Sequence, residues 1–283
     1  MKRIFFILIT LTTWHFSMAQ DLSVLVEKIA EVNEVQDAHI GYAGSPSKQY
    51  ERFELLKSKA TIKQLIDLTN HKNKVVACYA SWGLIDKGYA HLDQLLNKFL
   101  ENDHNVSTFS GCLKGSDPIS SEFYHRYWNK LRLESNNEEK ALQNDQQLLK
   151  MDSLILFKKG VYYLILDRAL HNRKYSDNYL SQIQLLAFEK KNLNAIEYIY
   201  KNSLEGNEKK IQNALTKYLN REKVWPSEYE VIFDILLSFK REDLTQVVIN
   251  ELKEIDNNNS YPSSSNYDAI LKKHGIKKDA NKG

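Results

Sequence analysis

Glycine and proline are scarce in this chain, which has 10 glycines and 4 prolines among 283 residues. So few turn-forming residues are not typical of an all-β sandwich or barrel, or of the glycine-rich nucleotide-binding folds. The chain also lacks a large charge of one sign, because 39 Lys and Arg residues stand against 36 Asp and Glu residues, a net charge of +3. This balance gives no reason to expect a nucleic-acid partner.

The motifs of common catalytic and metal centres are also missing from the sequence. There is no HExxH, P-loop, GxGxxG, GxSxG or DxDxDG segment. Histidine and cysteine residues do not occur in pairs at the spacing of zinc ligands. The sequence therefore predicts a protein that is not an enzyme and that holds no cofactor or metal ion.

The amino-terminal segment has the three-part pattern of a secretory signal peptide. Lys2 and Arg3 precede the uncharged, mostly apolar run 4–14, and the small residues Ser17 and Ala19 stand at the −3 and −1 positions of a cut after Ala19. We predict cleavage near Ala19 and export to the periplasm or the outside of the cell. The run is too short for a membrane span, and no later run is longer, so we expect no integral membrane segment in the mature chain.

The sequence has two cysteines, Cys78 and Cys112. In an oxidising compartment an even pair is consistent with one disulfide. The alternative is two buried free thiols, because free cysteine packs well as a small apolar residue. The sequence leaves both open.

Apolar residues recur at helical spacing along most of the chain. We predict a first helix over 21–37, a long loop over 102–117 that is rich in Ser and Gly, and a helix that starts at Pro118. Helix pairs over 179–204 and 208–239 recur at about 30–35 residues, a period typical of stacked helical hairpins.

The segment 60–88 predicts two short helices joined by a polar turn, and it resembles a HEAT-type repeat. The resemblance is carried by Leu65, Leu68, Asn73, Val76, Ala80 and Leu84. The proline that is usual in the turn is absent, and Ala77 stands where the family commonly has Arg. The resemblance implies an all-α fold, an α-α superhelix of HEAT-like hairpins, whose curved face binds other proteins. An irregular all-α globule of the same helices is the alternative.

These patterns divide the chain into four parts. We predict a signal peptide over 1–19, HEAT-like helical repeats over 20–134 and further helical repeats over 135–256. The remaining residues, 257–283, have the composition of a polar linker and a basic tail.

The leading functional hypothesis is an exported, non-catalytic scaffold with an unknown protein partner. One alternative is an enzyme or carbohydrate-binding accessory protein with a pocket near 102–128. Tyr124, Tyr127 and Trp128 would then form a binding surface, although core packing also explains their spacing. In a catalytic version of this alternative, Cys112 is a nucleophile and His125 its base. The other alternative is a structural envelope protein without a ligand.

Overall fold

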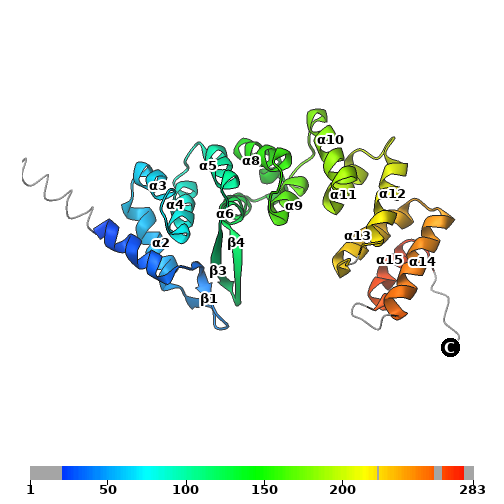
Figure 1. Ribbon diagram of the computed structural model, residues 1–283, viewed down its shortest axis with the longest axis horizontal. Coiled ribbons are helices and arrows are strands. Elements are labelled where there is room, and N and C mark those ends of the chain that lie inside the picture. The colour runs from blue at the N-terminus through cyan, green and yellow to red at the C-terminus, as the bar shows by residue number, and fades with distance from the viewer. Residues whose placement is uncertain (1–20, 222, 258–262, 277–283) are drawn as a thin grey trace, which may run out of the picture. The chain divides into compact units, whose positions relative to one another are not determined.

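The computed structural model describes residues 21–221, 223–257 and 263–276, which form two compact units that divide between Asn172 and Arg173. Figure 1 shows that helices dominate both units, which confirms the mostly helical fold expected from the sequence. The expected signal peptide lies outside the described residues. Within them, no helix is both long enough and apolar enough to cross a bilayer.

The amino-terminal unit, called the N-unit below, is built mainly from helices. Its described helices are residues 21–32, α2 (Lys48–Lys59), α3 (Ile62–Leu68), α4 (Lys74–Asp86), α5 (Leu92–Glu101), α6 (Ile119–Leu133), α7 (Glu138–Asn144), α8 (Gln146–Phe157) and α9 (Tyr163–His171). Side-chain caps set several starting points. The Thr61 hydroxyl and the Gln64 side chain form a capping box at α3, and the Asn73 side chain accepts hydrogen bonds from the first turn of α4.

The hairpin expected over 60–88 is present as α3 and α4. The two helices approach closely, because a Cβ atom on Gly83 would lie 3.2 Å from Leu65 Cδ1. All residues of α4 from Val75 to Ile85 are buried, so this helix forms the centre of the N-unit. The helices that follow the hairpin continue the stack in two rows. In one row α4 contacts α6 and α6 contacts α9, and in the other α5 contacts α8.

A four-stranded mixed sheet corrects the all-α prediction. Its strands are β1 (Val35–Ile40), β2 (Ser45–Pro46), β3 (Asn105–Gly111) and β4 (Leu113–Pro118), in the order β2-β1-β3-β4. Strand β1 runs parallel to β3, and β3 pairs antiparallel with β4. The sheet is therefore completed by two segments that are far apart in the sequence.

The sequence analysis placed β1 in a helix and the β3–β4 hairpin in a loop, and both errors have a physical cause. The helix expected over 21–37 ends after residue 32, and Asn33, at φ +50°, turns the chain into β1. The loop expected over 102–117 is a hairpin whose residues Val106 and Thr108 point into the protein. The sequence of the hairpin shows no clear alternation of apolar and polar residues, because the side that faces the protein is made largely of small and polar residues.

The carboxy-terminal unit, called the C-unit, is helical throughout its described residues. It contains α10 (Asp177–Gln184), a π-helical turn (Leu185–Glu189), α11 (Leu193–Asn202), α12 (Glu208–Leu219), α13 (Pro226–Ser238), α14 (Glu242–Asn257), a 3-10 turn (Ser264–Tyr267) and α15 (Asp268–Lys273). Tyr267 and Leu271 are buried, and Lys273 pairs with Asp234 of α13. Part of the expected linker and tail is therefore a packed helical segment.

Candidate functional site

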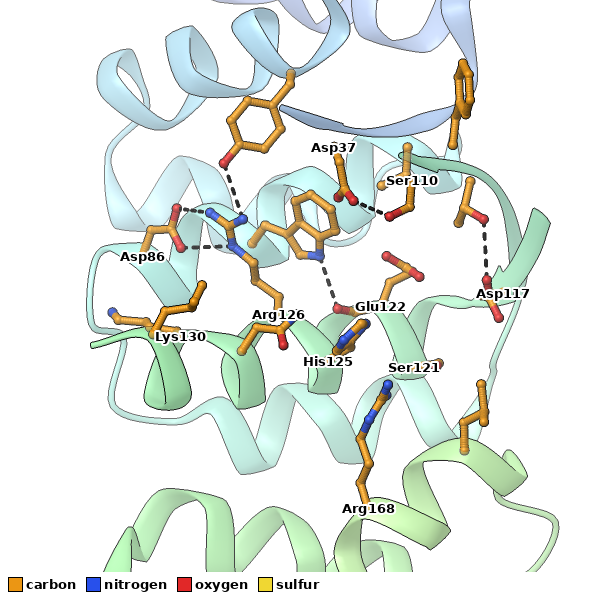
Figure 2. A pocket seen from close by; sticks show the side chains of 18 of the residues that line it. Asp37, Asp86, Ser110, Asp117, Ser121, Glu122, His125, Arg126, Lys130 and Arg168 are labelled. Carbon is orange, nitrogen blue, oxygen red and sulfur yellow. Dashed lines mark hydrogen bonds and ion pairs between the residues drawn. The ribbon is translucent and has the colours of Figure 1, made fainter. Parts of the chain in front are cut away.

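A cavity of about 770 Å³ opens in the N-unit between the sheet and the helices α4, α6 and α9. Figure 2 shows polar and charged side chains from all these elements pointing into it. Helix α6 supplies the largest share, because Glu122, Arg126 and Asn129 recur at the spacing of one helix face. Strands β1 and β3 supply Asp37 and Ser110 from the opposite wall.

At one end of the cavity, called the paired end, charged side chains of opposite sign form ion pairs. Arg126 donates from Nε to Asp86 Oδ1 at 3.2 Å and from Nη2 to Asp86 Oδ2 at 2.7 Å. Lys57 lies 3.2 Å from the same carboxylate, and Arg126 also donates to the Tyr50 hydroxyl. Burial would lower the pKa of Arg126, but the hydrogen bonds and charge of Asp86 outweigh it and raise this pKa. Such a network holds α2, α4 and α6 together.

At the other end, called the open end, Glu122 is unpaired. Within the described part of the chain, no hydrogen bond or ion pair joins its carboxyl to another residue. Burial raises the pKa of Glu122 to about 7, and the carboxylates of Asp117 and Asp37 add to the rise. Near neutral pH this side chain is therefore present both as an acid and as a carboxylate.

His125 and Arg168 lie beside Glu122 at the open end. Burial lowers the pKa of His125 to about 4, helped by the positive charge of Arg168, so the imidazole is neutral at pH 7. Burial also lowers the pKa of Arg168. Its guanidinium lies 5.1 Å from the centre of the Trp128 ring and makes no hydrogen bond or ion pair within the described residues. The open end thus holds an unpaired acid and an unpaired guanidinium.

The two aspartates of the open end have only neutral partners. Ser110 donates its hydroxyl to Asp37. The Thr108 hydroxyl donates to Asp117 Oδ2 at 3.4 Å, and the Tyr162 hydroxyl donates to Asp117 Oδ1 at 3.1 Å. Hydroxyl groups solvate a carboxylate but leave its charge in place. Negative charge therefore remains on this wall of the cavity.

These groups limit the chemistry that the cavity can support. Across the described residues there is no group of three or more His, Cys, Asp or Glu side chains placed to hold a metal ion. The aromatic rings of the lining are already covered, because Arg126 lies 5.1 Å from the centre of the Trp82 ring and Lys114 lies 4.9 Å from that of Phe109. Charge and hydrogen bonding, rather than stacking on an aromatic face, are what the cavity offers to a ligand.

The aromatic residues that we singled out as a binding surface serve other roles. Tyr124 is fully buried and donates its hydroxyl to Asp152, so it is not part of a surface. Trp128 donates from Nε1 to Asn172 Oδ1 at 2.9 Å, and Tyr127 donates to Asp145 at 3.1 Å. The spacing of these three residues belongs to core packing, the other explanation that the sequence offered.

The cysteines are free thiols in this structure, with Cys78 buried in α4 and Cys112 exposed at the β3–β4 turn. Burial raises the pKa of Cys78 well above its usual range. The mass of the alkylated protein with and without reduction is the test of a pairing in solution. His125 lines the cavity but Cys112 does not, so the nucleophile–base pair drawn from the sequence is not assembled.

Sequence reasoning missed Asp37, Glu122 and Arg168 as candidate site residues. Asp37 lies on a strand that was expected to be helix, and Arg168 is 46 residues beyond Glu122 in the sequence. The one available signal was the polar stripe of Glu122, Arg126 and Asn129 on an otherwise aromatic helix. Comparison of the chain with protein-family models, with curated proteins and with solved structures found no match.

Proposed function

We propose that the N-unit binds a small, charged, polar molecule at the open end of its cavity. The observation that carries this proposal is that Glu122 and Arg168 both line the cavity and form no ion pair within the described residues, whereas Arg126 and Lys57 at the paired end are joined to Asp86. Partly buried charges are costly unless they are paired. A ligand that supplies the missing partners recovers part of that cost on binding.

Binding rather than catalysis is the function that the geometry favours. A volume of about 770 Å³ lies within the range of small-molecule sites, about 300–1,000 Å³. The site has an acid near its pKa at neutral pH. Among the described residues, the hydroxyl groups of Ser110 and Thr108 donate to the carboxylates of Asp37 and Asp117, and neither donates to a histidine, the base that most often activates a hydroxyl nucleophile. The sequence hypothesis of a pocket near 102–128 gains support from this cavity, because Ser110, Asp117 and Glu122 all come from that segment.

A ligand screen with blocked variants tests the proposal. Ser110→Trp places a large ring at the wall of the cavity, whereas Ser107→Trp places the same ring on the same strand, at an exposed position outside the lining. Ligand-observed NMR is recorded with a panel of amino acids, dipeptides, carboxylic acids and sugars. We expect compounds that bind the unaltered protein and Ser107→Trp but not Ser110→Trp. Compounds that bind all three proteins equally, or a panel without any binder, would contradict the proposal.

A helical-repeat scaffold for a protein partner is the second candidate. It is supported by the order in which helix pairs pack, since α4 contacts α6 and α6 contacts α9 while α5 contacts α8. Stacked helical hairpins of HEAT type pack in such a series. Cross-linking in intact cells followed by mass spectrometry should return one dominant partner with links to these helices, and recovery of no reproducible link would count against the scaffold.

Both proposals include export of the protein, because residues 1–19 have the pattern of a secretory signal peptide. Amino-terminal sequencing of the protein isolated from its native cells tests it. We expect a mature chain that begins at Gln20, and a retained Met1 would contradict export.

A further inference from the structure

We infer that the ligand is a small zwitterion, such as a short peptide, whose carboxylate binds Arg168 and whose ammonium group faces the wall that carries Asp37 and Asp117. This inference rests on the proposed function, because it assigns the chemical class of the ligand to the same cavity. It comes from the way in which charges of opposite sign are separated at the open end. In Figure 2, Glu122 and His125 lie between Arg168 and the Asp37 wall.

Arg168 is suited to hold a carboxylate. A guanidinium presents parallel N–H donors that match the two oxygens of a carboxylate, and such charge-assisted pairs are the strong hydrogen bonds of proteins. The Trp128 ring, 5.1 Å from the guanidinium carbon, supports the side chain from one side. The positive charge of Arg168 is close enough to Glu122 to oppose the rise in the pKa of Glu122, yet the two side chains do not form an ion pair. An acceptor is therefore missing at the guanidinium.

The opposite wall is suited to hold an ammonium group. Within the described residues, the side chains of Asp37 and Asp117 accept hydrogen bonds only from hydroxyl groups. The negative charges of both residues raise the pKa of Glu122. An ammonium group has three N–H donors and a positive charge, so it is a stronger partner for a carboxylate of this wall than a hydroxyl group is. It would also relieve the repulsion between these carboxylates and Glu122.

The two walls together select a molecule with both charges. A simple anion that reaches Arg168 also meets the negative field of Asp37 and Asp117, and a simple cation at the aspartates meets the field of Arg168. Only a zwitterion gains from both. The cavity of about 770 Å³ is wide enough for a chain of several peptide units, which favours a short peptide over a single amino acid.

Three probes that differ only in charge test the inference by isothermal titration calorimetry at pH 7. They are the dipeptide alanyl-alanine, its N-acetyl derivative and its carboxamide. The first is a zwitterion, the second only an anion and the third only a cation. We expect the free dipeptide to bind at least about tenfold more tightly than either blocked form, which is the effect of losing one charge-assisted contact.

Variants assign the two charges to their residues. Arg168→Gln should weaken binding of the dipeptide about tenfold without weakening the carboxamide, which no longer meets the positive field of Arg168. Asp117→Asn should weaken the dipeptide without weakening the N-acetyl form. Arg132→Gln is the matched control, because Arg132 lies over the same Trp128 ring at 4.3 Å but pairs with Glu138 and does not line the cavity. It should bind all probes like the unaltered protein.

The outcomes separate this inference from the proposed function. Equal affinity for free and blocked dipeptides, with loss of all binding in Ser110→Trp, would overturn the zwitterion and leave the binding cavity in place. The zwitterion would also be overturned if the dipeptide did not bind while other members of the polar panel bound in a way that Ser110→Trp abolishes. Binding of no compound at all would overturn both.

Discussion

The two ends of the N-unit cavity are built from the same helix and differ in how their charges are matched. At the paired end, Arg126 and Lys57 share the carboxylate of Asp86, so the charges hold three helices together. At the open end, Glu122 and Arg168 face the cavity without such partners. The difference teaches that matched charges stabilise the fold, whereas unmatched charges are a cost that the fold carries and that a ligand can offset.

Breaking the paired end should have the largest effect on stability. Asp86→Ala leaves Arg126 without its carboxylate in a partly buried site, while Lys57 keeps its ion pair with Glu54, so we expect a loss of about 3 kcal/mol in the free energy of unfolding. Urea denaturation followed by circular dichroism measures it. In the control, Glu138→Ala removes the exposed partner of Arg132 and should cost less than about 1 kcal/mol. Equal losses in the two variants would show that the paired end is not special.

The open end should make stability depend on pH through Glu122. Its pKa is about 7 in the folded protein and 4.5 in its ordinary state, so between these values the folded protein holds a proton that the unfolded chain has lost. Stability therefore falls as pH rises from 4.5 to 7, by about 2–3 kcal/mol. Glu122→Gln should be as stable as the unaltered protein near pH 4.5 and more stable above pH 7. Parallel stability curves from urea denaturation at pH 5, 6, 7 and 8 would contradict this.

His125 should act in the opposite direction over the same range. Its pKa is about 4 when folded against an ordinary 6.5, so acidification protonates the unfolded chain first and stability falls as pH drops from 6.5 to 4. Burial is the main cause of the low pKa of His125; the charges of Arg168 and Arg132 lower it further, and those of Asp37 and Asp117 oppose them. We expect His125→Asn to remove about 2 kcal/mol of this acid sensitivity. The unfolding free energies of the unaltered protein and of His125→Asn are measured at pH 5 and at pH 7. The unaltered protein should lose more stability than the variant between pH 7 and pH 5.

Removing Arg168 should have the smallest effect on stability and a clear effect on its neighbours. Arg168→Gln breaks no ion pair, so we expect a change within about 1 kcal/mol. Because the charge of Arg168 helps to lower the pKa of His125, that pKa should rise in the variant. An NMR titration of the His125 ring protons measures the shift, and an unchanged midpoint would mean that Arg168 does not face this end of the cavity.

The helices of the fold were predictable because their signals are local. Apolar spacing and the polar turn between the two helices located the α3–α4 hairpin correctly, and the structure adds side-chain caps at Thr61 and Asn73. The sheet was not predictable, because β1 and β3 pair across about 70 residues and neither strand has a continuous apolar face. The HEAT-like superhelix stays a prediction.

The candidate site was less predictable than the fold, and for the same reason. Its residues come from β1, β3, β4, α6 and α9, so they meet only after the sheet has formed. The sequence directed attention to Tyr124 and Trp128, whose size marks them as core residues. Unpaired charges such as Glu122 and Arg168 look like ordinary surface residues in a sequence, because their lack of partners is a property of the folded chain alone.

A crystal structure of the protein grown with alanyl-alanine tests the central claim most directly. The account predicts density for the dipeptide at the open end, with its carboxylate within hydrogen-bonding distance of the Arg168 guanidinium and its ammonium group beside Asp37 and Asp117. A cavity filled only by water, with Arg168 turned away from Glu122 and His125, would contradict it.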